Sequence, residues 1–72
     1  METIEITTEF IKLQDLLKFA ALVSTGGEAK IRILDGEVMV NGEVCLQRGR
    51  KIRPGDKVTF AGRELGVTNA GR

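Results

Sequence analysis

The chain has 72 residues, of which 42% are hydrophobic and 29% charged, which suits one small globular domain with a thin core. It contains no histidine and a single cysteine, so it lacks a Cys–His or Ser–His pair for nucleophilic catalysis and the thiolate or imidazole ligands of a zinc site. We therefore expect a protein that is not an enzyme and that carries no cofactor and no metal.

The location expected from the sequence is the cytoplasm. No apolar stretch approaches the roughly 20 residues that cross a bilayer, and residues 1–5 lack the basic and apolar regions of a secretory signal. Cys45 has no partner for an internal disulfide and lies between Val44 and Leu46, in a stretch typical of a strand. Because free cysteine is among the most buried residue types, we expect an inert thiol rather than a reactive one.

The net charge of +1 conceals an uneven distribution. Residues 44–63 carry six Lys or Arg against the single acid Asp56, a local charge of +5, whereas the rest of the chain sums to −4. A basic segment on an otherwise acidic domain concentrates positive potential in one region. The alternative is a charged loop that only faces solvent.

The first elements expected are a short strand and an amphipathic helix. Residues 3–7 alternate between apolar and polar side chains, which predicts a strand. Thr8 is placed to cap a helix that begins near Glu9, where an acid also suits the positive end of the helix dipole. Over residues 10–20 the apolar side chains recur at helical spacing.

A second helix is expected over about residues 27–34. Thr25 and Glu28 fit the capping box, in which a hydroxyl and a carboxylate each accept a hydrogen bond from a backbone amide. The alternation of residues 30–33 would by itself favour a strand, but the cap favours the helix.

Strand and turn signals dominate the remainder of the chain. Asn41-Gly42 stands between two apolar runs and predicts a type I′ hairpin turn. Pro54-Gly55-Asp56 predicts a turn, and residues 68–72 form a polar tail that we expect to be frayed. The whole chain, residues 1–72, is thus predicted to be one α+β domain with two helices packed on a small twisted antiparallel sheet.

Taken together, residues 8–60 resemble the S-four-type RNA-binding domain, a family named after a small-subunit ribosomal protein. The resemblance is carried by the helix sequence around residues 11–19, by V-M-V-N-G at 38–42, by R-K-I at 50–52 and by G-D-K-V at 55–58. It implies the alpha-L RNA-binding motif, a small bacterial member that consists of this domain alone, and structured RNA such as ribosomal RNA or a tRNA-like fold as the partner.

The resemblance also implies which side chains touch RNA phosphates, namely basic residues of both helices and of the loop before the G-D turn. The expected contact set is Lys12, Lys18, Lys30, Arg32, Arg48, Arg50, Lys51 and Arg53. Four of these, two from the second helix and two from the loop, are expected to form one electrostatic surface: Lys30, Arg32, Arg50 and Lys51. They have no obvious acidic partner at a spacing of four residues, and only Glu28 and Asp35 lie near the second helix. Many family members carry an arginine where this chain has Gly26-Gly27, a difference that bears on the choice of RNA.

The residues themselves favour structured RNA over single strands. Affinity for RNA comes largely from Lys and Arg neutralising phosphates, and duplex RNA is read mainly through its shape and backbone. The chain has three Phe, no Trp and no Tyr, and the Phe residues lie at spacings typical of a core. We therefore expect no aromatic surface on which unpaired bases stack.

The turn between the two helices is open to two interpretations. Unhindered backbone amides and hydroxyls at a helix N-terminus form a natural phosphate-binding turn. The other interpretation is an interhelix turn held only by its capping box. The residues concerned are Ser24, Thr25, Gly26 and Gly27.

Two other classes of protein are alternatives to an RNA-binding domain. The β-grasp sulfur carriers share the V-N-G hairpin and the G-D turn, but their chemistry uses a C-terminal Gly-Gly and this chain ends in Ala70-Gly71-Arg72. A protein-interaction module is the third class, for which no distinctive groove is evident. We therefore expect a monomeric RNA-binding domain that has no membrane or small-molecule partner.

Overall fold

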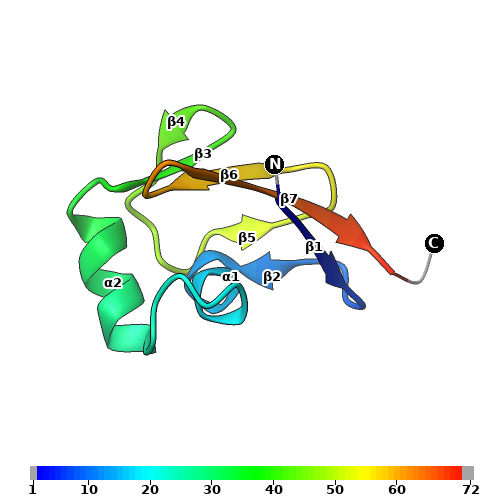
Figure 1. Cartoon of the computed structure of the whole chain (residues 1–72), viewed down its shortest axis with the longest axis horizontal. Coiled ribbons are helices and arrows are strands. Elements are labelled where there is room, and N and C mark those ends of the chain that lie inside the picture. The colour runs from blue at the N-terminus through cyan, green and yellow to red at the C-terminus, as the bar shows by residue number, and fades with distance from the viewer. Residues whose placement is uncertain (1, 71–72) are drawn as a thin grey trace.

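A computed structural model describes residues 2–70 as a five-stranded sheet, two helices on one side of it, and a separate two-stranded ribbon (Figure 1). The elements in chain order are β1 (Glu2–Ile6), β2 (Ile11–Lys12), α1 (Leu13–Phe19), α2 (Gly26–Leu34), β3 (Val38–Val40), β4 (Glu43–Val44), β5 (Lys51–Ile52), β6 (Lys57–Phe60) and β7 (Arg63–Asn69). The sheet has the order β1-β7-β6-β3-β4, and the ribbon joins β2 to β5. This arrangement confirms the α+β class.

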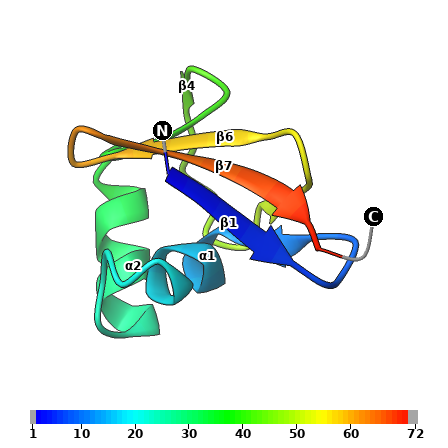
Figure 2. The same cartoon turned by 45° about the vertical axis from the view of Figure 1, so that its right-hand side comes forward.

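The sheet is mixed rather than antiparallel, which corrects the sequence prediction. Strand β1 runs parallel to β7, with Glu2 opposite Leu65 and Ile6 opposite Asn69, whereas the other pairs described are antiparallel. Figure 2 shows β1 and β7 side by side. Two parallel neighbouring strands need a long connection, and here residues 7–62, between β1 and β7, supply it.

The pairing of β1 with β7 also corrects the prediction of a frayed tail. Thr68 and Asn69 belong to β7, and the amide of Ala70 donates a hydrogen bond to the carbonyl of Ile6 at 2.8 Å. The last two residues of the predicted tail, 71–72, lie outside the described part of the chain.

The hydrophobic core lies between the sheet and the helices. Its largest fully buried side chains come from both helices, the ribbon and the sheet: Leu13, Leu16, Leu17, Ile33, Val38, Ile52, Val58 and Leu65. No polar or charged residue is buried within residues 2–70. Cys45 is buried in this core, as expected, and its lack of reactivity stays a prediction. Neither helix in the described residues has the length and apolarity of a membrane span.

Helix α1 begins at Leu13 rather than near Glu9. Thr8 does not cap it, because its hydroxyl donates a hydrogen bond to the carbonyl of Phe10 at 2.7 Å. The next two residues form strand β2, and the N-cap is Lys12, whose side chain makes no capping bond. The predicted start of the first helix is therefore wrong.

Helix α2 agrees with its predicted cap. The hydroxyl of Thr25 accepts a hydrogen bond from the amide of Glu28 at 3.0 Å, and the Glu28 carboxylate accepts one from the amide of Ser24 at 2.8 Å. The reciprocal bond reaches Ser24 rather than Thr25, one residue away from the standard capping box. Residues 30–33 are helical, so their alternation does not indicate a strand.

The hairpin between β3 and β4 has the predicted type of turn. Asn41 and Gly42 have φ angles of 52° and 87°, and a type I′ turn requires positive φ at both central residues. Ala61 and Gly62, between β6 and β7, have φ angles of 54° and 77°.

Candidate nucleic-acid interface

The β2–β5 ribbon separates apolar from basic side chains. Ile11 pairs with Ile52, and Lys12 pairs with Lys51. Because Ile52 is fully buried and successive side chains of a strand point to opposite faces, the two lysines lie on the outer, exposed face of the ribbon.

The backbone of the basic loop, which we define as residues 47–56 with β5 inside it, is fixed against the start of α1. The amide of Leu13 donates to the carbonyl of Arg50 at 2.8 Å, and the amide of Gln14 donates to the carbonyl of Arg48 at 3.1 Å. These carbonyls satisfy helix-terminal amides that would otherwise need a side-chain cap or water. The loop therefore carries its charges on a backbone held by the helix.

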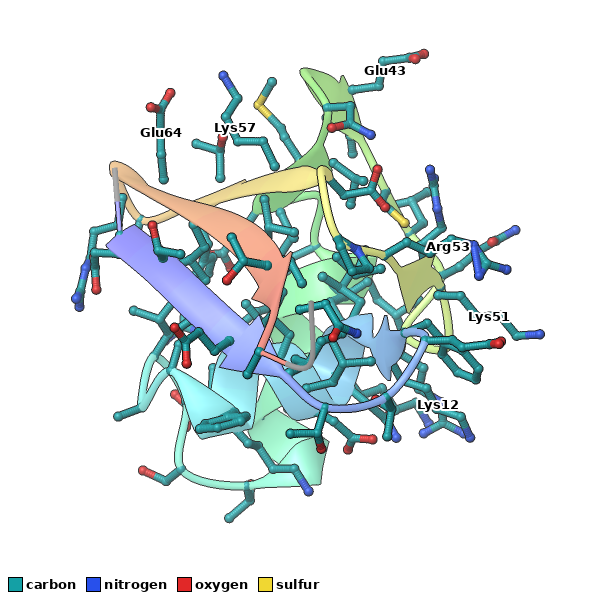
Figure 3. The ribbon with its side chains drawn as sticks, turned by 90° about the vertical axis from the view of Figure 1, so that its right-hand side faces the viewer. Lys12, Glu43, Lys51, Arg53, Lys57 and Glu64 are labelled. Carbon is teal, nitrogen blue, oxygen red and sulfur yellow. The ribbon has the colours of Figure 1, made fainter. Side chains whose placement is uncertain are left out.

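Five exposed cations gather on this ribbon and the loop beside it, and we name them the cationic face. Its members are Lys12, Arg48, Arg50, Lys51 and Arg53. In Figure 3 Lys12, Lys51 and Arg53 extend on the same side of the molecule. All five belong to the predicted RNA-contact set, and the fold brings their backbones together around the start of α1. Their contact with RNA stays a prediction.

An aromatic ring lies within the cationic face. The Nζ of Lys51 is 4.9 Å from the ring centroid of Phe10, and the Cζ of Arg53 is 5.8 Å from it. Phe10 is half-buried and Phe19 is 64% exposed, so only Phe60 of the three Phe residues is buried in the core. The expectation that all three belong to the core is wrong, and the sequence did not predict that Phe10 lies within the cationic face.

Apart from Lys30, the other cations within residues 2–70 each form an ion pair with an acid, whereas those of the cationic face form none. Within residues 2–70, no ion pair involves any of the five. By contrast, Arg63 pairs with Glu2 at 2.6 Å and Lys57 pairs with Glu64 at 3.5 Å. Residues 2–70 also contain no cluster of three or more His, Cys, Asp or Glu side chains that could hold a metal ion.

Lys30 and Arg32 lie on different flanks of α2, because residues two apart on a helix are about 200° apart around its axis. Arg32 pairs with Glu28 at 3.9 Å and with Glu37 at 3.3 Å. The expectation that Arg32 lacks acidic partners is therefore wrong, although the Glu28–Arg32 spacing of four residues could have revealed the pair. Contact of either residue with RNA stays a prediction.

Lys18 lies beside the start of α2. Its Nζ is 4.0 Å from the position that a Cβ on Gly26 would take, and 3.7 Å from the carboxylate of Asp15. Gly26 is one helical turn before Lys30, so Lys18 and Lys30 approach the same flank of α2. The hydroxyl of Thr25 is already engaged in the cap, and phosphate binding by the turn of residues 24–27 stays a prediction.

The V-N-G and G-D motifs meet at the end of the basic loop. The Asn41 side-chain amide donates to Oδ1 of Asp56 at 3.1 Å, and the amide of Arg53 donates to its Oδ2 at 2.8 Å. The amide of Lys57 donates to Oδ1 of Asn41 at 2.9 Å. These bonds join the β3–β4 turn to the end of the loop, a link that the sequence motifs did not reveal.

The carboxylate of Asp56 is held in its charged form. Burial alone would raise the pKa of Asp56, but hydrogen bonds from the Arg53 amide and the Asn41 side chain, with the charges of Arg50 and Arg53 nearby, hold that pKa below its usual value. The ionised carboxylate is therefore the form that anchors the loop.

The fold and the cationic face define a small α+β domain in which a basic β-ribbon docks on a short helix. Residues 4–68 match the S4 domain family, and the chain belongs to that family. The membership confirms the S-four-type resemblance and favours it over a β-grasp sulfur carrier.

Similar proteins come from two well-known bacteria. The chain is 44% identical over 59 residues to the probable ribosome maturation protein RlbA of Bacillus subtilis, covering 82% of this chain and 83% of that protein. It is 40% identical over 57 residues to the putative RNA-binding protein YbcJ of Escherichia coli, covering 79% and 81%.

A solved structure has the same fold. The solution structure of YbcJ from E. coli, described as revealing an alpha-L motif involved in RNA binding, superposes with a TM-score of 0.72 at 36% identity. The match covers 94% of this chain and 87% of that one.

Proposed function

We propose that this chain is a non-catalytic RNA-binding module that grips structured RNA through the cationic face. The observation that carries the proposal is the set of five exposed cations that form no ion pair within the described residues. Such cations are free to neutralise phosphates and release their counterions, which is the main source of RNA affinity. The name of the E. coli relative, a putative RNA-binding protein, supports RNA as the ligand. The name of the B. subtilis relative, a probable ribosome maturation protein, supports our choice of ribosomal RNA as the target.

The way the cationic face is held favours folded RNA over a flexible strand. One end of the loop is fixed by the carbonyls of Arg48 and Arg50 on α1, and the other by the bonds of Asp56. A fixed arrangement of charges suits phosphates whose spacing is itself fixed by RNA structure. Lys18 of α1 and Lys30 of α2 would add a second contact region.

A ribosomal target would place the protein in the cytoplasm, and one domain with one cationic face needs no second copy. We therefore include a cytoplasmic, monomeric state in the proposal. Light scattering of the protein with and without RNA would test the monomer.

Salt dependence tests the proposed function most directly. With about four phosphate contacts, the logarithm of affinity for a ribosomal RNA hairpin should fall against the logarithm of salt concentration with a slope of roughly −3. An unstructured RNA of equal length should bind more weakly. A flat dependence, or a preference for the unstructured RNA, would contradict the proposal.

A pair of matched variants then locates the surface. Lys51→Ala/Arg53→Ala removes two charges of the cationic face, and Lys57→Ala/Arg63→Ala removes two charges that are already paired. The first variant should reduce the magnitude of the salt slope by about two, and the second should leave it unchanged. Equal effects of the two variants would place the RNA elsewhere.

A further inference from the structure

We propose that Phe10 is a positioning residue of the cationic face, whose ring holds Lys51 and Arg53 in the arrangement that RNA phosphates meet. The inference rests on the proposed function and adds that an aromatic ring orders two of the charged side chains of the cationic face. Family resemblance and composition pointed only to Lys and Arg, whereas the geometry brings an aromatic side chain between them.

The register of the ribbon puts the ring and the cations on one face. Ile11 lies opposite Ile52 and Lys12 opposite Lys51, so continuing the antiparallel ladder by one residue places Phe10 opposite Arg53. Because side chains alternate between faces, Phe10 shares the outer face with the cations, while Ile52 points into the core. Directly opposed and diagonal cross-strand neighbours are both within reach of an aromatic side chain.

The contacts fit this geometry. The Lys51 ammonium and the Arg53 guanidinium lie 4.9 Å and 5.8 Å from the centroid of the Phe10 ring, inside the roughly 6 Å over which a cation is attracted to an aromatic face. Both cations come from one strand and the residue after it, so a single ring restrains both.

A ring orders a cation without neutralising it, and this distinguishes Phe10 from an acid. Arg32 is ordered by two carboxylates, Glu28 and Glu37, which cancel its charge locally. Phe10 attracts Lys51 and Arg53 through its quadrupole and adds no negative charge that would compete with phosphates. Restricting these long side chains before RNA arrives also lowers the conformational entropy that binding would otherwise cost.

The test replaces the ring by an aliphatic side chain. Phe10→Leu keeps an apolar side chain on the ribbon and removes the quadrupole, and Phe10→Met is a second non-aromatic variant in case the first does not fold. Phe10→Tyr restores an aromatic ring. Affinity is measured across salt for a fully paired RNA hairpin and for the same hairpin with one unpaired base.

The expected result is that both aliphatic variants bind the two RNAs about three- to tenfold more weakly, with an unchanged salt slope. The slope is unchanged because the number of phosphate contacts stays the same, and Phe10→Tyr should bind like the parent. In NMR spectra of the free parent protein, the side-chain Hε protons of Lys51 should be shifted upfield by the ring and should lose that shift in Phe10→Leu.

Three outcomes would overturn the inference. Parent-like affinity of a folded aliphatic variant would show that the ring does not assist binding. Weaker binding only to the hairpin with the unpaired base would show that the ring stacks on a base instead. Lys51 protons without an upfield shift in the parent would show that the ring does not hold the cation. Failure of the proposed function is distinct, since the parent would then bind neither RNA in a salt-dependent way.

Discussion

The cationic face and the β1–β7–β6 side of the sheet use the same kinds of basic residue in opposite ways. On the sheet, Arg63 donates two hydrogen bonds to Glu2, at 2.6 and 2.7 Å, and these bonds lower the pKa of the Glu2 carboxyl. On the cationic face, Lys51 and Arg53 lie against an uncharged ring. The proposed interface therefore differs from the paired surface of the sheet in whether its cations form ion pairs.

The largest effect is expected from reversing one charge in each region. Lys51→Glu and Lys57→Glu both replace a strand lysine and both change the net charge by the same amount. Lys51→Glu should weaken binding of a ribosomal RNA hairpin by roughly tenfold to a hundredfold, because a charge-assisted contact becomes a repulsion. Lys57→Glu should stay within about threefold, since a distant exposed charge is screened.

Fluorescence anisotropy at physiological salt would measure both affinities, with circular dichroism to confirm that each variant is folded. If the two variants lose affinity equally, only the net charge matters, and the contrast between the two regions fails.

A smaller effect is expected from releasing the loop without removing a cation. Asp56→Ala removes the bonds to Asn41 and to the Arg53 amide, which should lower the free energy of unfolding by about 1–2 kcal/mol in urea denaturation and also weaken RNA binding. Asp35→Ala is the control, because that exposed acid should change stability by no more than about 0.5 kcal/mol.

The same carboxylate predicts the sign of a pH effect. Since the pKa of Asp56 is lowered in the folded state, its stabilisation is complete above the unfolded-state pKa of an aspartate and is lost as the pH falls through the lowered value. Asp56→Asn should remove this acid-side loss. An identical pH profile in the parent and in Asp56→Asn would show that the charge of Asp56 does not stabilise the fold.

The smallest effects are expected from removing one cation from each flank of α2. Arg32→Ala should lower the free energy of unfolding by about 0.5 kcal/mol, less at high salt, because exposed ion pairs contribute little. Lys30→Ala should leave stability unchanged and reduce the magnitude of the RNA salt slope by about one. The opposite pattern, a stability loss in Lys30→Ala and a slope change in Arg32→Ala, would place the RNA on the other flank.

Local sequence chemistry predicted the elements whose causes are local. The type I′ turn at Asn41-Gly42 follows from two neighbouring residues, and the start of α2 follows from the hydroxyl of Thr25 and the carboxylate of Glu28 within one turn. Four of the five basic residues of the cationic face were likewise visible as a charge run before β6, and only Lys12 lies outside it.

Long-range contacts account for what the sequence did not show. The first amides of helix α1 donate to the carbonyls of Arg48 and Arg50, which are far away in the sequence. No residue near Leu13 therefore indicates where the helix begins. The parallel pairing of β1 with β7 joins opposite ends of the described chain. The position of Phe10 among the cations depends on the β2–β5 register, which the spacing of residues along the chain does not reveal.

The capping of α1 by distant carbonyls has a consequence during synthesis. A nascent chain that has emerged only as far as α2 lacks the loop that completes the first helix, and closing so long a segment costs chain entropy before it gains any contact. The five cations therefore reach their binding arrangement only after β5 has left the ribosome. A peptide copying the loop alone would carry the charges without that arrangement, because the arrangement also needs β2 and the start of α1.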